Sequence, residues 1–255
     1  MRRFALILFL AGCPGGGAHD AHGPDATATD AIQHLAAARA AVKTFRADST
    51  MDYRFGDQRV KGEVIVIGTP GQHVRLNALS PMGGSVMADL ACDGATFYYR
   101  DSQHNCELTG SCSKDTIAQL LHVELAPDDF LYLAAGTPPV IPGTADMTWD
   151  AAKGEEHVTI KGDQGTQTIT LDDKRDVLRA ELKAPDGKHV WTVENKDFTA
   201  TDGGQRVPGK TRFMTENSND DLIVDWNKIE ENVDLPQGKF KFDLIGLATC
   251  GQKSP

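Results

Sequence analysis

Residues 58–91, QRVKGEVIVIGTPGQHVRLNALSPMGGSVMADLA, contain three short runs in which apolar and polar residues alternate. The segments GTPG, at 68–71, and SPMGG, at 80–84, separate these runs. A period of two bounded by Gly and Pro is typical of antiparallel strands with one apolar and one solvent-facing side. Pro81 cannot join a backbone ladder, so the loop should stand clear of the sheet with Met82 at its tip. The alternative is an ordinary hairpin whose Met82 packs onto its own sheet.

Similar alternation continues along most of the chain and predicts a β-rich domain. We expect strands at 49–57, 59–67, 73–79, 85–91, 95–100, 146–150, 156–161, 166–171, 176–183, 189–198, 206–215 and 220–226. Inward-facing candidates in the second half are Trp149, Val158, Ile160, Ile169, Leu171, Leu178, Leu182, Trp191, Val193 and Phe213. Strands repeating at roughly eight to twelve residues indicate a barrel or a sandwich, and we assign residues 29–255 to one domain.

Three helices interrupt the strands. The first should begin at Thr29, and its apolar stripe consists of Ile32, Leu35, Ala38, Val42 and Phe45. Short helices are predicted at 116–122 and 130–135, the second opened by Pro127. The first helix could instead lie on a membrane, with Arg39, Lys43 and Arg46 at the head groups. Because small alanines flank the stripe, we favour burial against the sheet.

The N-terminus has the pattern of an export signal. Arg2 and Arg3 precede a short apolar run, and Leu10-Ala11-Gly12-Cys13 resembles a bacterial lipobox. We expect residues 1–12 to be a signal peptide, Cys13 to be acylated, and residues 13–28 to form a flexible tether rich in Gly, Pro and Ala. The alternative is an ordinary secreted protein in which Cys13 occurs by chance.

Export would place the four other cysteines in an oxidising compartment, where an even number fits disulfides. Cys92, Cys106, Cys112 and Cys250 allow three pairings. We favour Cys106–Cys112, which closes a short loop and leaves Cys92 to pair with Cys250. A zinc site is disfavoured because no Cys-x-x-Cys occurs and the spacing is irregular.

Composition argues against two broad classes of function. The formal net charge is −10, whereas a nucleic-acid surface needs clustered Lys and Arg. The sequence contains no Gly-x-Ser-x-Gly elbow, no His-Glu-x-x-His and no phosphate-binding Gly loop. We therefore predict a protein that is not an enzyme and uses no metal or cofactor. A Ser/His/Asp set assembled in three dimensions, as in a secreted hydrolase, is the weakest alternative.

The order of strand, Thr-Pro-Gly turn, VRL strand and Ser-Pro-Met-Gly-Gly loop resembles the LolA/LolB group of lipoprotein-localisation factors, and LolB most of all. The resemblance implies a half-open antiparallel barrel with an N-terminal helix and two short helices over its concave face. In LolB an apolar residue at the Pro-x-Gly position helps deliver lipoproteins into the membrane. Pro81, Met82 and Gly83 match that position. Residues 232–242 resemble the closing strand of the LolA group.

The same resemblance implies a site, partners and a location. An apolar cavity for acyl chains would be lined by Val64, Val66, Val74, Leu76, Leu120, Leu121, Leu131, Trp149, Leu178 and Trp191. Partners would be acylated lipoproteins or lipid, the outer membrane through the lipid on Cys13, and a periplasmic LolA-like carrier. Pro14 stands where Asp is associated with inner-membrane retention, which favours the outer membrane, facing the periplasm or, alternatively, the cell surface.

Departures from LolB support a second hypothesis, a structural or interaction module whose interior is filled by its own side chains. These departures are the extra cysteines, the longer C-terminal half and a methionine in place of leucine at the loop tip. An open apolar cavity would favour the carrier, and a packed interior would favour the module. Arg75, in the strand before the loop, is expected to face outward.

The loop gives the first testable prediction. Met82→Glu should impair lipoprotein insertion into liposomes, because a carboxylate resists entry into an apolar phase, while folding stays intact. Transfer of a labelled lipoprotein measures the effect, and circular dichroism controls for folding. Unchanged transfer would rule out the proposed role of the tip.

Overall fold

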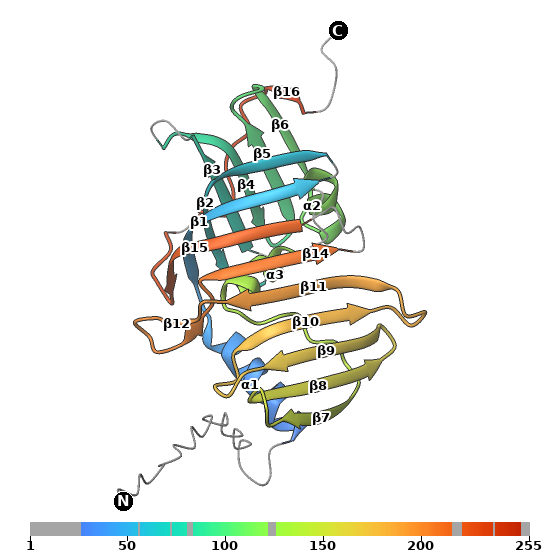
Figure 1. Cartoon of the computed structure of the whole chain (residues 1–255). Coiled ribbons are helices and arrows are strands. Elements are labelled where there is room, and N and C mark those ends of the chain that lie inside the picture. Colours follow the sequence, from blue (N-terminus) through green and yellow to red (C-terminus); the bar gives the residue numbers. More distant parts are fainter. Residues whose placement is uncertain are drawn as a thin grey trace, which may run out of the picture.

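One large twisted sheet organises the chain (Figure 1). A computed structural model describes residues 27–55, 57–71, 73–80, 84–121, 126–215, 221–236 and 238–250. Within these ranges the fourteen strands follow the order β16-β6-β5-β4-β3-β2-β1-β15-β14-β11-β10-β9-β8-β7, antiparallel except for β16 beside β6. Cys13 and the 80–84 loop residues Pro81, Met82 and Gly83 lie outside the described residues.

The strands form two meanders that meet at β1 and β15. The first meander contains β1 (Phe45–Phe55), β2 (Gln58–Thr69), β3 (His73–Leu79), β4 (Val86–Asp93), β5 (Thr96–Asp101) and β6 (Cys106–Ser111). The second contains β7 (Thr144–Asp150), β8 (Glu155–Gly162), β9 (Gly165–Leu171), β10 (Val177–Lys183), β11 (His189–Lys196), β14 (Lys210–Thr215) and β15 (Asp221–Glu231). The short strands are β12 (Thr199–Ala200), β13 (Arg206–Val207) and β16 (Ala248–Thr249).

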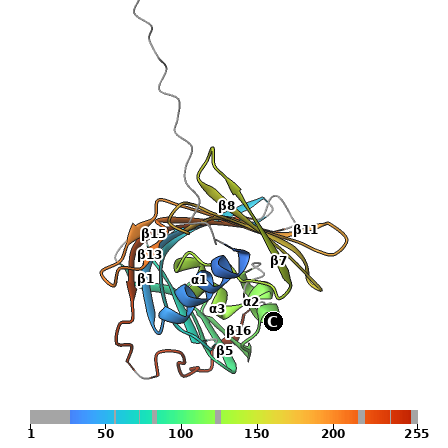
Figure 2. The ribbon, with the colours of Figure 1, turned by 90° about the horizontal axis from the view of Figure 1, so that it is seen from below.

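Within the described residues, the sheet curls around three helices without closing (Figure 2). These are α1 (Ala28–Ala41), α2 (Lys114–Leu121) and α3 (Pro127–Ala134). One core cluster lies between α3 and the first meander and includes Phe97 and Leu131; another lies between α1 and β7–β10 and includes Leu35 and Ile160. The predicted mainly β, half-open architecture is confirmed. Within the described ranges, no helix combines the length and the apolar character needed to cross a bilayer.

The N-cap of the first helix is Thr27, two residues before the predicted Thr29, and the helix begins at Ala28. Thr27 and Asp30 form a capping box: the Asp30 amide donates to the Thr27 hydroxyl (3.2 Å), and the Thr27 amide donates to the Asp30 carboxylate (3.0 Å). This reciprocal bonding requires a spacing of three residues, which Thr29 does not have with Asp30. The helix ends at Ala41, so the predicted stripe residues Val42 and Phe45 are buried beyond it rather than on it.

The predicted disulfide pairing is wrong. Cys92 bonds to Cys112 and Cys106 bonds to Cys250, with Cα–Cα distances of 5.6 Å and 5.0 Å. The segment predicted as a loop is strand β6, and at about 3.3 Å per residue Cys106 and Cys112 are roughly 20 Å apart. A disulfide cannot bridge Cα atoms more than about 7 Å apart without backbone movement.

The predicted closing strand at 232–242 is also not formed. The place beside β1 is taken by β15, and residues 238–250 instead cross the outer side of the first meander as a segment that we call the C-terminal strap. Arg75 does face outward, but under the strap: it pairs with Asp89 and donates to the Lys239 carbonyl (3.0 Å). Phe242 lies over the guanidinium groups of Arg75 and Arg100.

Glu107 holds the end of the strap. Its carboxylate is 5% exposed and accepts hydrogen bonds from the backbone amides of Ile245 (3.0 Å), Gly246 (3.1 Å) and Leu247 (3.2 Å). Burial by itself raises the pKa of Glu107, but the amide donors and the Arg100 guanidinium outweigh it and lower the pKa below its ordinary value. This contact therefore contributes its full stabilisation at pH values above the ordinary glutamate pKa. The contribution is lost as the pH falls through the lowered pKa that Glu107 has in the folded protein.

The observed pairing gives a second prediction. Replacing both Cys106 and Cys250 by serine should lower the free energy of unfolding by about 2–4 kcal/mol, because the bond closes a very long loop of the unfolded chain. Urea denaturation measures the loss. Peptide mapping of the unreduced wild-type protein is the control, and a peptide linking Cys106 to Cys112 would contradict the structure.

Candidate functional site

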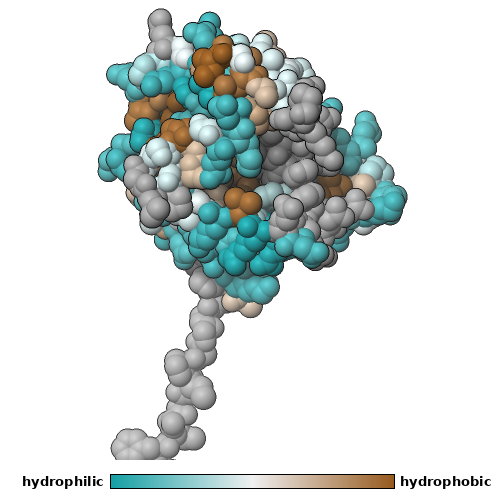
Figure 3. Space-filling model, turned by 90° about the horizontal axis from the view of Figure 1, so that it is seen from above, coloured by the Kyte–Doolittle hydropathy of each residue, from teal (hydrophilic) through white to brown (hydrophobic). Residues whose placement is uncertain are grey.

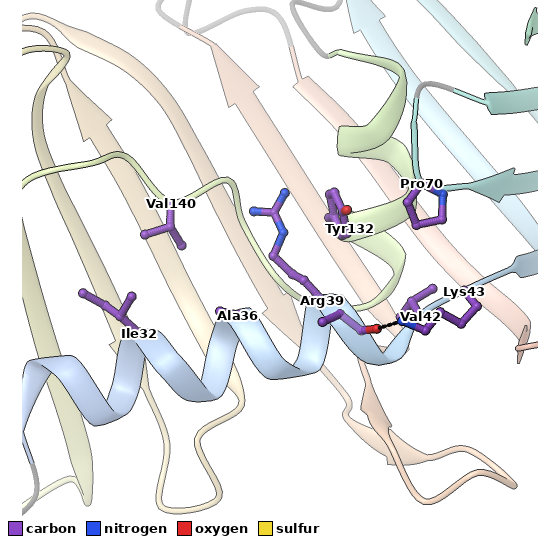
Figure 4. Close-up of a pocket in the computed structure, with 9 residues that line it drawn as sticks. Ile32, Ala36, Arg39, Val42, Lys43, Pro70, Tyr132 and Val140 are labelled. Carbon is purple, nitrogen blue, oxygen red and sulfur yellow. Dashed lines mark hydrogen bonds between the residues drawn. The ribbon is translucent and has the colours of Figure 1, made fainter. Parts of the chain in front are cut away.

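An open groove of about 590 Å³ lies between α1 and α3 on the concave side of the sheet (Figure 4). Its lining consists of Ile32, Ala36, Arg39, Ala40, Val42, Lys43, Pro70, Tyr132 and Val140. Most of these residues are apolar, and two are cationic. The groove is of the size that small-molecule sites commonly have.

One face of α1 forms the floor. Ile32, Ala36 and Arg39 recur at steps of four and three residues, so they lie along the same side of the helix, and Lys43 extends the floor just beyond the helix end. Ala36 and Ala40 carry only a methyl group, which leaves space between α1 and the opposite wall. The floor is thus a shallow channel and not a filled helix–helix contact.

Tyr132 of α3 provides the opposite wall. The Arg39 guanidinium stacks 3.7 Å from the centre of the Tyr132 ring and donates to the Pro138 carbonyl (3.0 Å). Asp129, one helical turn before Tyr132, accepts from the Ala126 amide (2.7 Å). Burial raises the pKa of Asp129, and Arg39 partly opposes the rise. Arg39 therefore links α1 to the α3 region across the groove.

The third wall is the segment that follows α3, held in place by Gln167 of β9. The Gln167 side chain is fully buried; its oxygen accepts from the Ile141 amide (2.9 Å) and its nitrogen donates to the Pro139 carbonyl (2.7 Å). These two bonds fix the backbone on both sides of Val140, whose side chain lines the groove (Figure 4).

Of the residues predicted to line a cavity, those whose side chains are described do not line this groove. Val66, Val74, Leu76 and Leu131 are buried in the packed core under α3, with Val64 and Trp191 partly buried against it. Side chains from α3 fill the space that the sequence-based hypothesis left open. Leu120 and Leu121 belong to α2, but their side chains lie outside the described ones.

Leu178 and Trp149, the two predicted cavity residues on β10 and β7, are not fully buried. Leu178 is half-buried, and Val177 takes the core position, because the register of β10 shifts between Val177 and Arg179. Such a bulge changes which residues of the strand face inward. Trp149, on the edge strand β7, is half-buried.

Sequence reasoning missed the groove because no local pattern marks it. The available signal was Arg39 and Lys43 beside small alanines, which suggested membrane head groups as an alternative. The residues that complete the groove, Tyr132 and Val140, are distant in the sequence and come to face this part of the chain only through the fold.

A second feature is the end of the first meander that carries the 80–84 loop. The described large apolar side chains that are exposed are Val60, Val86, Leu244 and Ile245. The strand directions place all four at this end, where β2, β4 and β6 begin. Seen from above, the molecule shows apolar patches set among polar surface (Figure 3).

One group of side chains has ligand types that a metal could use. Asp150, Glu155 and His157 bring ligand atoms within 4.8 Å of one another. The Lys153 ammonium lies 3.9 Å from both carboxylates and already balances part of their charge. We assign no metal to this group.

Comparisons with known proteins show likeness in structure and not in sequence. No protein-family model and no curated protein matches the chain. A crystal structure of a DUF1329 family protein from Desulfovibrio piger matches with a TM-score of 0.59 and 10% identity, over 84% of this chain and 95% of that one. A LolA superfamily protein from Nitrosomonas europaea matches with a TM-score of 0.55 and 13% identity, over 85% and 98%. The chain has a LolA-like fold.

A third solved structure agrees with this assignment of fold. It is a domain named as an outer membrane lipoprotein-sorting protein, from Vibrio parahaemolyticus, with a TM-score of 0.53 and 7% identity over 83% of this chain and 94% of that one. At these identities the similarity establishes the LolA-like fold alone.

The wall of the groove gives a third prediction. Gln167→Leu should lower the free energy of unfolding by about 1–3 kcal/mol, because the Ile141 amide and the Pro139 carbonyl lose their buried partner. Chemical denaturation measures the change. Thr168→Val, on the solvent side of the same strand, is the matched control and should change stability little. Equal stability of the two variants would contradict the proposed support.

Proposed function

We propose that this protein is a cell-envelope carrier or receptor that holds acyl chains of lipids or lipoproteins in the groove between α1 and α3. The observation that carries the proposal is the open, mostly apolar groove on the concave side of a LolA-like fold. Each buried methylene contributes about 0.8 kcal/mol, so a chain covered along the groove gains several kcal/mol before the cost of association is subtracted.

The likeness to a LolA superfamily protein and to a lipoprotein-sorting domain supports this class of ligand. The binding step requires no covalent chemistry and no cofactor, so we propose a protein that is not an enzyme. Acyl chains would pass between sites according to differences in affinity.

A finer version of the proposal is a LolB-like receptor. Acyl chains on Cys13 would anchor the protein in the outer membrane, facing the periplasm, and a periplasmic LolA-like carrier would deliver acylated lipoproteins to it. Met82 would enter the bilayer. The exposed Val60, Val86, Leu244 and Ile245 at the same end of the sheet support contact with an apolar phase there.

The packed interior favours a second candidate, an envelope lipoprotein acting as a structural or interaction module. Val66, Val74, Leu76 and Leu131 fill the space under α3 where a LolB-like cavity was expected. In this case the groove between α1 and α3 would hold no transported ligand.

Filling the groove separates the two candidates and gives a fourth prediction. Ala36→Trp, placed in a Cys13→Ala form of the whole chain, should lower the amount of co-purifying lipid several-fold, because the indole occupies the channel. Mass spectrometry of extracted lipids measures the effect. Gln33→Trp, exposed on the same helix but outside the groove lining, is the matched control and should retain lipid. Absence of lipid from the parent and both variants would favour the interaction module.

A further inference from the structure

We infer that the groove selects anionic amphiphiles, molecules with an acyl chain and a head group that carries a carboxylate or a phosphate. The inference rests on the proposed function, because it specifies which acyl compounds the groove prefers. It follows from the sign and position of the charges in the groove lining.

The lining contains two cations, Arg39 and Lys43, and no acidic residue. The whole chain has 36 acidic and 26 basic residues, so the charge of the lining is opposite in sign to the net charge of the chain. Asp129 interacts with Arg39, but it lies outside the lining and one of its carboxylate oxygens accepts from the Ala126 amide. An anion entering the groove therefore meets no carboxylate among the lining residues.

The charges are not spread evenly along the groove (Figure 4). Ile32 and Val140 lie at one end, Lys43 and Pro70 lie at the other, and Arg39 lies between them. At 1.5 Å per helical residue, the helical part of the floor from Ile32 to Ala40 is roughly 12 Å long, a little less than the hydrocarbon depth of one membrane leaflet, and Lys43 lies just beyond the helix end. A chain lying along the apolar end would thus place its head group beside Lys43.

Among the described residues, each cation uses one side-chain donor and keeps the others for a ligand. The Lys43 ammonium donates to the Ala40 carbonyl (2.6 Å), which is one of its three donors. The Arg39 guanidinium uses one of five on the Pro138 carbonyl. Lys43 also covers a carbonyl at the negative end of α1, so an approaching anion meets the ammonium group before the helix dipole. Tyr132 holds the plane of the Arg39 guanidinium in the groove.

Displacement of a neutral dye tests the inference. The fluorescent probe N-phenyl-1-naphthylamine is bound to the detergent-free Cys13→Ala form of the full chain and displaced with dodecanoate, dodecanol or dodecyltrimethylammonium. We expect dodecanoate to compete about tenfold better than dodecanol, and the cationic compound to compete least, because charge-assisted hydrogen bonds favour only the anion. Dodecyl phosphate in a parallel series distinguishes phosphate from carboxylate heads.

Two variants test whether the preference for the anion over the alcohol arises in the groove. Lys43→Gln should bring the ratio of dodecanoate to dodecanol affinity close to one while dodecanol still binds. Lys61→Gln, which removes the same charge from an exposed position on β2, should leave the ratio as in the parent. Equal affinity for the anion and the alcohol in the parent protein overturns the inference but leaves the proposed function in place. A ratio that Lys43→Gln does not change also overturns it. Failure of every compound, including the dye, to bind would instead overturn the proposed function.

Discussion

The backbone pairing of β1 with β15 is the contact on which the rest of the structure depends. It runs from Phe45 opposite Glu231 to Arg54 opposite Asp221, and it joins two meanders whose other strands pair mostly with their neighbours in sequence. On the inner side the Phe45 ring meets the edge of Trp226, with centroids 6.4 Å apart. Without this pairing each meander would expose an open edge of unpaired backbone groups. The joined sheet instead forms one curved wall with a common concave side.

The helices α1 and α3 cover different parts of that wall. Leu131 of α3 belongs to the core cluster of the first meander, and Leu35 of α1 belongs to that of β7–β10. The groove lies where the two helices approach each other, because Ala36 leaves space that a larger side chain would fill. The hollow of this protein is therefore a gap between helices above a well-packed sheet. It is not an empty barrel, and its polar side chains are Arg39 of α1, Lys43 just beyond α1 and Tyr132 of α3.

The outer side of the first meander is covered in a different way. No helix of the described chain lies there; the C-terminal strap does, held by Glu107, by the Cys106–Cys250 bond and by Phe242 over two arginines. These contacts use charged and aromatic groups suited to a partly exposed surface. The strap gives the outer strands a second set of contacts and leaves the end of the sheet with exposed apolar side chains.

Local patterns in the sequence determined most of the strands and the two short helices, because alternation and turn residues act over a few positions. They indicated a barrel or a sandwich, and the half-open form came from the resemblance to the LolA/LolB group. They predicted neither strand β6 nor the pairing of Cys92 with Cys112, since a cysteine's partner depends on which strands become neighbours. The bulge that places Val177 in the core instead of Leu178 is likewise a property of strand register. The groove was beyond local reasoning for the same reason. Arg39 and Tyr132 are far apart in the sequence, and only the folding of the sheet around α1 and α3 brings them together.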